Sequence, residues 1–170
     1  MIIIPVSSKA HGEHLIFVDW EDFDKIKDYT WGISKHDNIL YAYTKIKGKF
    51  VHMHRLLLNF PKSPVDHKNG VSLDNRRENL RTCTTSENGM NQKKQNRNTS
   101  SIYKGVYFHK QRQKFTVRIK LKQKTIHIGY FENEHDAGKA YNKKAIELFG
   151  EFARLNIIKE NKKWLYWPQG

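Results

Sequence analysis

The feature that most limits how this chain can fold is a run of ten residues, 92–101, that contains no apolar side chain. The run has the composition of a linker rather than of a segment that packs into a core. The chain has 170 residues, of which 38% are hydrophobic, a low fraction for one well-filled core. We therefore predict two small domains, over 1–91 and 102–156, joined by the basic linker 92–101 and followed by a tail over 157–170.

The charge of the chain indicates its partner. The formal net charge is +14, which attracts polyanions and raises their rate of encounter. Residues 88–131 contain eleven Lys and Arg but no Asp or Glu, while interleaved apolar residues give this stretch a core to fold around. We expect a folded surface that faces phosphates, and nucleic acid as the partner.

Cysteine usage and hydropathy exclude other classes. The single Cys83 rules out an internal disulfide and a CxxC zinc knuckle, so zinc is not expected. No stretch approaches eighteen apolar residues, and the apolar start of the chain is too short for a signal peptide. We expect a cytoplasmic protein with no membrane partner.

The first domain has the pattern of an antiparallel meander. A short strand over 15–18 precedes a short acidic helix that begins near Asp19, and two hairpin connectors separate three further apolar segments. Those segments lie at 30–34, 40–45 and 50–54. The run that follows is stopped by Pro61, so it forms at most two helical turns.

The sequence pattern of the second domain predicts three strands and one helix, so we expect an α+β chain. The strands lie at 105–108, 115–121 and 125–130, and the helix begins at Asn133 and ends before Gly150. Its buried face should hold Ala137, Ala140, Tyr141, Ala145 and Leu148. Strand alternation places Phe115, Val117, Ile119, Ile126 and Ile128 on the helix side and leaves a free, hydrogen-bonding face with Thr116, Arg118, Lys120, Thr125 and His127.

The densest polar cluster lies at 64–91 and has the pattern of a hairpin followed by a helix. Asn69-Gly70 permits a turn, 80–83 supplies a second strand, and Thr84 with Glu87 forms a capping box that starts a helix. This packing can bring the Asp66 carboxylate and the Asn88 amide to one point. Two protein oxygens leave room for waters and phosphate, as Mg²⁺ prefers.

The same cluster contains a candidate general base. Hydrolysis of a phosphodiester needs a base for water and a cation for the developing charge. His67 follows Asp66 directly, although an ideal strand would point the two to opposite faces, so the site requires a bend near Gly70. A lone Asp-His pair is more often a surface ion pair, whereas the whole spaced set favours catalysis.

These residues resemble those of phage and homing HNH endonucleases over roughly 50–92. The motifs are Asp66-His67-x-Asn69-Gly70, Asn79-Leu80-Arg81 and the helix with Asn88 and Asn91. The resemblance implies a ββα-metal fold in which His67 is the general base, Asn79 orients His67, and Asp66 with Asn88 binds one Mg²⁺ or Mn²⁺ ion. The last motif position is Asn88 rather than the frequent histidine.

Several residues near these motifs have a structural alternative. His54 and Arg55 match the family where it borders the site, and we expect them at the DNA, although His54 has the alternative of a satisfied strand histidine. For His52 and Asn91 we favour a strand histidine and a helix-surface amide, and Asn79 has the alternative of a loop amide. Arg81 is balanced between a phosphate contact and a pair with Glu78 or Asp74.

Residues 102–156 resemble the plant ethylene-response-factor (APETALA-type) DNA-binding domain. The motifs are Tyr103-Lys104-Gly105-Val106, Ile128-Gly129-Tyr130-Phe131, 136–141 and Ala153-Arg154-Leu155-Asn156. The resemblance implies a sheet that lies in the major groove. The aligned outward positions are Lys104, Tyr107, Arg118, Lys120, Thr125 and His127, and Lys93, Lys94 and Arg97 of the linker should contact phosphates.

The chain as a whole is similar to endonucleases of phages and mobile elements. We expect a metal-dependent enzyme that nicks or cuts double-stranded DNA, acting as a monomer or a DNA-induced dimer. The alternatives are a DNA-binding regulator with a degenerate nuclease core and a basic RNA-binding protein. The RNA-binding alternative lacks an RNA-recognition aromatic run.

Overall fold

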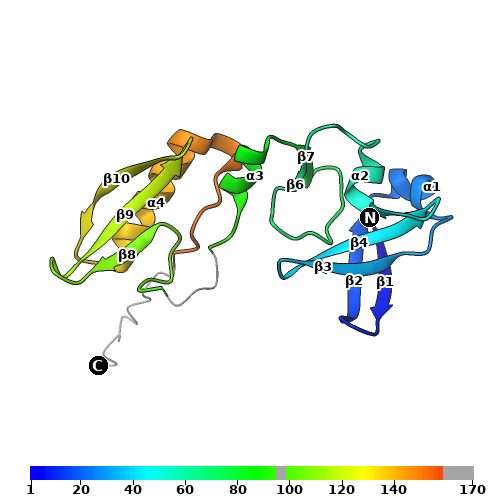
Figure 1. The fold of residues 1–170 in the computed structure, drawn as a ribbon, viewed down its shortest axis with the longest axis horizontal. Helices are drawn as coiled ribbons and strands as arrows, with labels where there is room; N and C mark the ends of the chain where they lie inside the picture. Colours follow the sequence, from blue (N-terminus) through cyan, green and yellow to red (C-terminus); the bar gives the residue numbers. More distant parts are fainter. Residues whose placement is uncertain (95–98, 159–170) are drawn as a thin grey trace, which may run out of the picture. The chain divides into compact units, whose positions relative to one another are not determined.

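The structure of the protein is a computed structural model that describes residues 1–94 and 99–158. It is a mixed α/β structure with several small antiparallel sheets and few helices. The chain divides into two compact units, Met1–Gln92 and Lys93–Gly170, which are described separately (Figure 1). Arg97 and the C-terminal aromatic residues lie outside the described residues. No helix within the described part is long and apolar enough to cross a membrane.

The first unit opens with a hairpin and a short helical segment. Strand β1 (Ile2–Ser8) pairs with β2 (Gly12–Val18), which includes the predicted strand and begins three residues before it. Strand β1 was not predicted, because its side chains alternate in exposure although almost all residues at the start of the strand are apolar. The 3-10 turn η1 (Trp20–Asp22) and helix α1 (Phe23–Ile26) follow.

The predicted meander is confirmed. Strands β3 (Gly32–His36), β4 (Ile39–Ile46) and β5 (Lys49–His52) form an antiparallel sheet in that order. Its inner face supplies Ile33 and Ala42 to a core shared with the first hairpin and with α2 (Met53–Leu57). The core residues are Val6, Ile16, Val18, Ile26, Ile33, Ala42, Met53, Leu57 and Leu80.

The polar cluster forms a hairpin followed by a helix, as predicted. Strands β6 (Val65–His67) and β7 (Leu80–Thr82) are antiparallel, and α3 (Thr85–Asn91) follows them. The capping box is confirmed: the Glu87 N–H donates to the Thr84 hydroxyl, and the Thr84 N–H donates to the Glu87 carboxylate. This cap determines where α3 starts, because it satisfies two N–H groups at the helix end.

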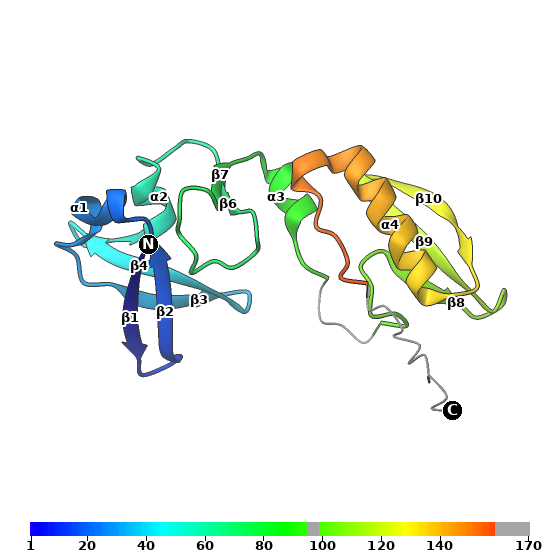
Figure 2. The same ribbon diagram turned by 180° about the vertical axis from the view of Figure 1, so that it is seen from behind.

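The second unit is the predicted sheet and helix. Strands β8 (Val106–His109), β9 (Lys114–Leu121) and β10 (Lys124–Phe131) form an antiparallel sheet, and α4 (Glu134–Phe149) lies across one face of it (Figure 2). The Asn133 cap is confirmed, since its side chain accepts from the N–H groups of His135 and Asp136. The turn η2 (Gly150–Phe152) ends the helix.

Two details of the second unit differ from prediction. The buried helix residues are Ala137, Gly138, Tyr141, Ala145 and Phe149, so the stripe is rotated relative to the predicted one, and Ala140 and Leu148 are only half-buried. Thr116, expected on the free face, is buried and hydrogen-bonded to His127 at 3.1 Å. Strand alternation gives the face of a residue but not whether its neighbours cover it.

Gly105 shows why one turn of the second unit needs glycine. Its φ is +76°, and a Cβ there would lie 2.3 Å from the Tyr141 ring and 2.7 Å from the Arg118 carbonyl oxygen. Glycine therefore allows α4 to pack closely on the start of the sheet.

Candidate active site

The Asp66 carboxylate lies at the centre of the β6–β7–α3 region. Asp66 is buried, and the Asn91 side-chain amide donates to both of its oxygens at 3.0 Å and to the His67 carbonyl at 2.9 Å. The surface role predicted for Asn91 is therefore wrong. Asn91 lies one turn beyond Asn88, and this i, i+3 spacing to a candidate ligand could have identified it.

Arg81 is the ionic partner of Asp66. Its Nε and Nη2 donate to the same carboxylate oxygen of Asp66 at 2.9 and 2.7 Å, and 9% of the Arg81 side chain is exposed. The two carboxylates considered as partners of Arg81, Asp74 and Glu78, pair with Arg76. Antiparallel pairing of Asp66 with Arg81 across β6 and β7 explains the choice, because opposed residues on neighbouring strands share a face.

His67 is buried beside this pair. Its Nε2 lies 3.4 Å from the Asn75 side-chain oxygen, a long contact in which the ring would be the donor. A neutral His67 with the proton on Nε2 leaves Nδ1 as the basic atom. Burial lowers the pKa of His67, while Asn75 and the carboxylates of Asp66 and Asp74 act in the opposite direction.

Two further rings contact His67, and a third packs behind them. The His54 ring lies edge-on to it at 5.2 Å between centroids, the Tyr41 ring lies at 6.4 Å, and His52 stacks on His54 at 5.4 Å. His54 is 8% exposed and packs against the His67 ring, so it does not form part of a DNA-facing surface as expected. Tyr41 was not predicted, because it comes from β4, far from the motif in sequence.

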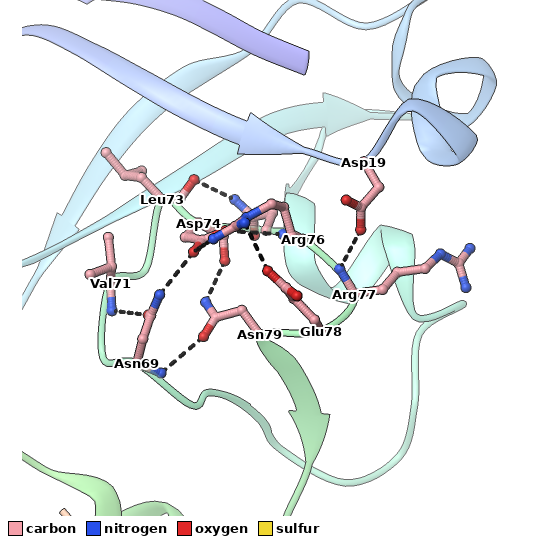
Figure 3. Close-up of polar contacts among 10 residues, drawn as sticks. Asp19, Asn69, Val71, Leu73, Asp74, Arg76, Arg77, Glu78 and Asn79 are labelled. Carbon is pink, nitrogen blue, oxygen red and sulfur yellow. Dashed lines mark hydrogen bonds and ion pairs between the residues drawn. The ribbon is translucent and has the colours of Figure 1, made fainter. Parts of the chain in front are cut away.

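A polar network shapes the loop between β6 and β7. The Asn79 side chain accepts from the Asn69 N–H at 2.9 Å and donates to the Asp74 carbonyl at 2.6 Å. The Asn69 amide donates to the Asp74 carboxylate at 2.8 Å, so the three residues turn toward one another (Figure 3). The side chain that reaches His67 is that of Asn75, whereas the contacts of Asn79 hold the loop that carries Asn75.

The N-terminal elements anchor this loop. Phe17 of β2 exchanges backbone hydrogen bonds with the loop, donating to Leu73 at 2.9 Å and accepting from Asn75 at 2.8 Å. The Arg77 guanidinium forms a two-point ion pair with the fully buried Asp22 at 2.6 and 2.7 Å. The Arg77 N–H also donates to the Asp19 carboxylate at 2.8 Å (Figure 3).

The Asp66 carboxylate could bind a hard divalent cation through one of its oxygens. One Asp66 oxygen accepts from Arg81 and Asn91, whereas among the described residues the other accepts from Asn91 alone and keeps a lone pair. Half-buried Asn88 lies one helical turn before Asn91. Within residues 1–94 and 99–158, no three His, Cys, Asp or Glu side chains are placed to hold a metal. A site of one carboxylate and one amide, completed by water and phosphate, needs no such group.

The residues expected at DNA lie in different environments. The Arg55 guanidinium donates to the carbonyl oxygens of Pro61 and Ser63, and so holds the loop after α2. Lys104 is half-buried, and burial and the nearby Arg154 lower its pKa to about 8. On the sheet face away from α4, the exposed members of the predicted set are Tyr107, Arg118, Lys120, Thr125 and His127.

A comparison with family models identifies the region that contains this network. A model described as HNH endonuclease matches residues 49–90. These residues form an HNH endonuclease domain. The resemblance to HNH endonucleases, predicted for roughly 50–92, is thereby confirmed for residues 49–90. No curated protein and no solved structure matches the chain.

The buried histidines of the HNH region make stability depend on pH. Burial, followed by the neighbouring His67, His52 and Arg55, lowers the pKa of His54 to about 3 in the folded protein, against about 6.5 in an unfolded chain. Below pH 6.5 the unfolded chain therefore binds the extra proton, and the folded state loses stability as pH falls. From pH 7 to pH 5 this amounts to about 2 kcal/mol for His54 alone.

Urea unfolding of the full chain at pH 7 and pH 5 tests this expectation. His54→Gln should flatten the dependence by about 2 kcal/mol, while His36→Gln, at an exposed position of the same unit, should leave it as in the wild type. An equal loss of stability on acidification in wild type and His54→Gln would show that His54 is not the source of the pH dependence.

Proposed function

We propose that the chain is a metal-dependent DNA endonuclease in which His67 is the general base. The observation that carries the proposal is the buried juxtaposition of His67 and Asp66 at the hairpin of an HNH domain, with Asn91 of the following helix bonded to both residues. Structural salt bridges occur without catalysis. Phosphodiester hydrolysis needs a base for water and a ligand for a cation. His67, oriented by the Asn75 oxygen, can be the base, and the Asp66 carboxylate can be a ligand.

In the proposed reaction His67 takes a proton from the attacking water. Its lowered pKa keeps the ring neutral near pH 7, so that Nδ1 can accept that proton while the Asn75 oxygen holds Nε2–H. Asp66 and Asn88 would hold a divalent ion, Mg²⁺ or Mn²⁺, which when bound stabilises charge on the phosphate and the leaving oxygen. Asn79 and Asn69 keep the loop in the conformation that presents Asn75 to the base.

The second unit is proposed to select the DNA. Its outward sheet face has exposed Arg118, Lys120, Thr125 and His127 without an acidic residue on β9 or β10, and strands with such side chains can enter a major groove and reach base edges. Lys93 and Lys94 are proposed to contact phosphates. The whole chain would thus combine a cutting unit with a reading unit, as in enzymes of phages and mobile elements.

A DNA-binding regulator that no longer cuts is the second candidate, since it would keep the same basic surfaces. The presence of Asp66, His67, Asn79 and Asn88 together argues against it, because a protein that only binds DNA does not need this catalytic set. The measurement that separates the two is nicking of supercoiled plasmid by the purified chain with Mg²⁺, with EDTA as the control.

His67→Ala should abolish nicking and leave DNA affinity nearly unchanged. The base acts on water and contributes little to holding a duplex, and general bases are typically worth about 10²–10⁴-fold in rate. Single-turnover rates and binding curves of the two proteins are the measurements. A rate within about threefold of wild type, well short of that range, would remove His67 from the mechanism.

Asp66→Asn and Asn88→Ala should both raise the concentration of Mg²⁺ that supports half-maximal nicking. The shift should be larger for Asp66→Asn, because a carboxylate contributes a full charge and an amide only a dipole. The Asn substitution is chosen because its amide oxygen can still accept from the Arg81 guanidinium, whereas Ala would remove both the charge and the acceptor beside that buried group. Ser86→Ala, an exposed change on the same helix, is the control. If the metal titration is the same for all four proteins, Asp66 and Asn88 are not ligands.

Arg118→Ala and the double change Lys93→Ala/Lys94→Ala should separate base reading from phosphate binding. Loss of a base-edge arginine typically costs about 1–3 kcal/mol of discrimination, whereas loss of phosphate contacts weakens all sequences and flattens the salt slope by about one unit per contact. Arg118→Ala should therefore reduce the difference in affinity between selected and random DNA, measured over a salt series. Equal weakening on both DNAs, with a shifted slope, would make Arg118 a phosphate contact.

A further inference from the structure

The outward face of the meander carries aromatic rings that no motif explains. Tyr41, Tyr43 and Lys45 alternate along β4, opposite to the face that sends Ala42 and Thr44 inward. Register places Phe50 beside Lys45 and His52 beside Tyr43 on the same outward face. The HNH match begins at residue 49, so most of this face lies outside it.

These rings form a strip that ends at the proposed catalytic base. Phe50 lies 5.2 Å from Tyr43 between centroids, and the Lys45 ammonium lies 5.0 Å above the Phe50 ring. Tyr41, two residues from Tyr43 on β4, contacts both His52 at 5.3 Å and His67 at 6.4 Å. The strip therefore leads from Phe50 and Tyr43 directly to the position where the reacting phosphate would bind.

A pocket of about 390 Å³ opens beside Tyr43 on this face. Its walls include the rings of Tyr29, Trp31 and Tyr43, all half-exposed, together with the polar side chains of Asp28, Thr30 and Lys45. Aromatic walls with a carboxylate, a hydroxyl and an ammonium at the rim suit a flat, polar-edged ring better than an aliphatic ligand.

The walls of the pocket are held in place by local structure. The Trp31 Nε1–H donates to the Ile26 carbonyl at 3.0 Å, and Tyr29 lies edge-on to Trp31 at 6.1 Å. Gly32 pairs with Tyr43 across the sheet, and a Cβ at Gly32 would lie 3.0 Å from the Tyr43 ring and 3.2 Å from its hydroxyl oxygen. The absence of a side chain at Gly32 thus lets Tyr43 lie flat over β3, and the pocket is largely preformed.

We propose that this pocket binds an unpaired nucleobase of the DNA substrate, close to the bond that is cut. The inference rests on the proposed endonuclease function and adds a strand-binding site to it. Stacking on aromatic rings requires an exposed base face, which a paired and stacked base within a duplex does not offer. Lys45 would contact a flanking phosphate, and Asp28 would accept a hydrogen bond from an amino or ring N–H group of the base.

The spacing along the strip relates the pocket to the cut. Residues two apart on a strand are about 7 Å apart, which corresponds to roughly two nucleotide steps of stacked DNA at about 3.4 Å each. Tyr41 in turn lies 6.4 Å from His67. The base in the pocket should therefore lie within a few nucleotides of the phosphate at His67.

The test uses the full chain with His67→Ala, which binds without cutting, and a single-stranded oligonucleotide that contains the fluorescent base 2-aminopurine. Stacking should quench the 2-aminopurine emission on binding. Tyr43→Ala should remove the quenching and lower affinity for the oligonucleotide about five- to a hundredfold, the usual range for losing one stacked base. Tyr43→Phe should retain both signals, because the ring face is kept.

Two further variants keep the result interpretable if Tyr43→Ala unfolds. Tyr43→Leu keeps apolar bulk without a ring and should lose quenching in a chain whose circular dichroism is unchanged. Trp20→Ala, which removes the exposed ring stacked on Phe23 elsewhere in the same unit, is the matched control and should behave as wild type. All of these variants are made in the His67→Ala chain, and equal quenching and affinity in that chain, Tyr43→Leu and Trp20→Ala would overturn the proposal.

Free nucleotide and duplex DNA distinguish the source of the base. Deoxyadenosine monophosphate should not compete at concentrations that match the oligonucleotide, and a fully paired duplex carrying the probe should show no Tyr43-dependent quenching. Competition by the free nucleotide at equal concentration would overturn the proposal in favour of a nucleotide site. Failure of the proposed endonuclease function would be a separate result. In that case the wild-type chain would nick no plasmid, whatever the Tyr43 variants bind.

Discussion

The HNH region depends on the buried carboxylate of Asp66. Asp66 projects from β6, accepts two hydrogen bonds from Arg81 of β7, and accepts the amide of Asn91 from α3. Strands of three residues are too short to fix their own geometry by backbone pairing. The side chain of Asp66 thus joins the two strands and the helix, and removing it would leave a guanidinium that is 9% exposed without its charge partner.

The N-terminal hairpin and meander complete the HNH region rather than form a separate layer. Phe17 adds backbone bonds to the loop that carries Asn75, and the ion pair of Arg77 with Asp22 holds the next turn. The meander contributes Tyr41, whose ring lies 6.4 Å from the His67 ring. The burial that lowers the pKa of His67 therefore comes in part from elements that no nuclease motif contains.

Local patterns in the sequence predicted the parts of this structure that local physics determines. The meander, the Thr84 capping box and the Asn133 helix cap follow from alternation and from hydrogen bonds between residues two or three positions apart. The errors arose where the outcome depends on distant residues. Asn91 is buried because Asp66 lies opposite it, and Thr116 is buried on an otherwise exposed face. Tyr41 reaches His67 only through the register of the meander, which no single segment encodes.

Asp66 pairs with Arg81 and is also the proposed metal ligand, and these two roles limit how strongly the ion can bind. Arg81 already balances most of the carboxylate charge, so a divalent ion at the remaining lone pair gains less Coulomb energy than it would at a free carboxylate and also meets the repulsion of the guanidinium. The neutral Asn88 adds only a dipole to the attraction. A phosphate group supplies the missing negative charge, since it can coordinate the ion and face Arg81 from the open side. In the proposed enzyme, DNA and metal therefore bind cooperatively, and the ion is held firmly only where there is a phosphodiester to hydrolyse.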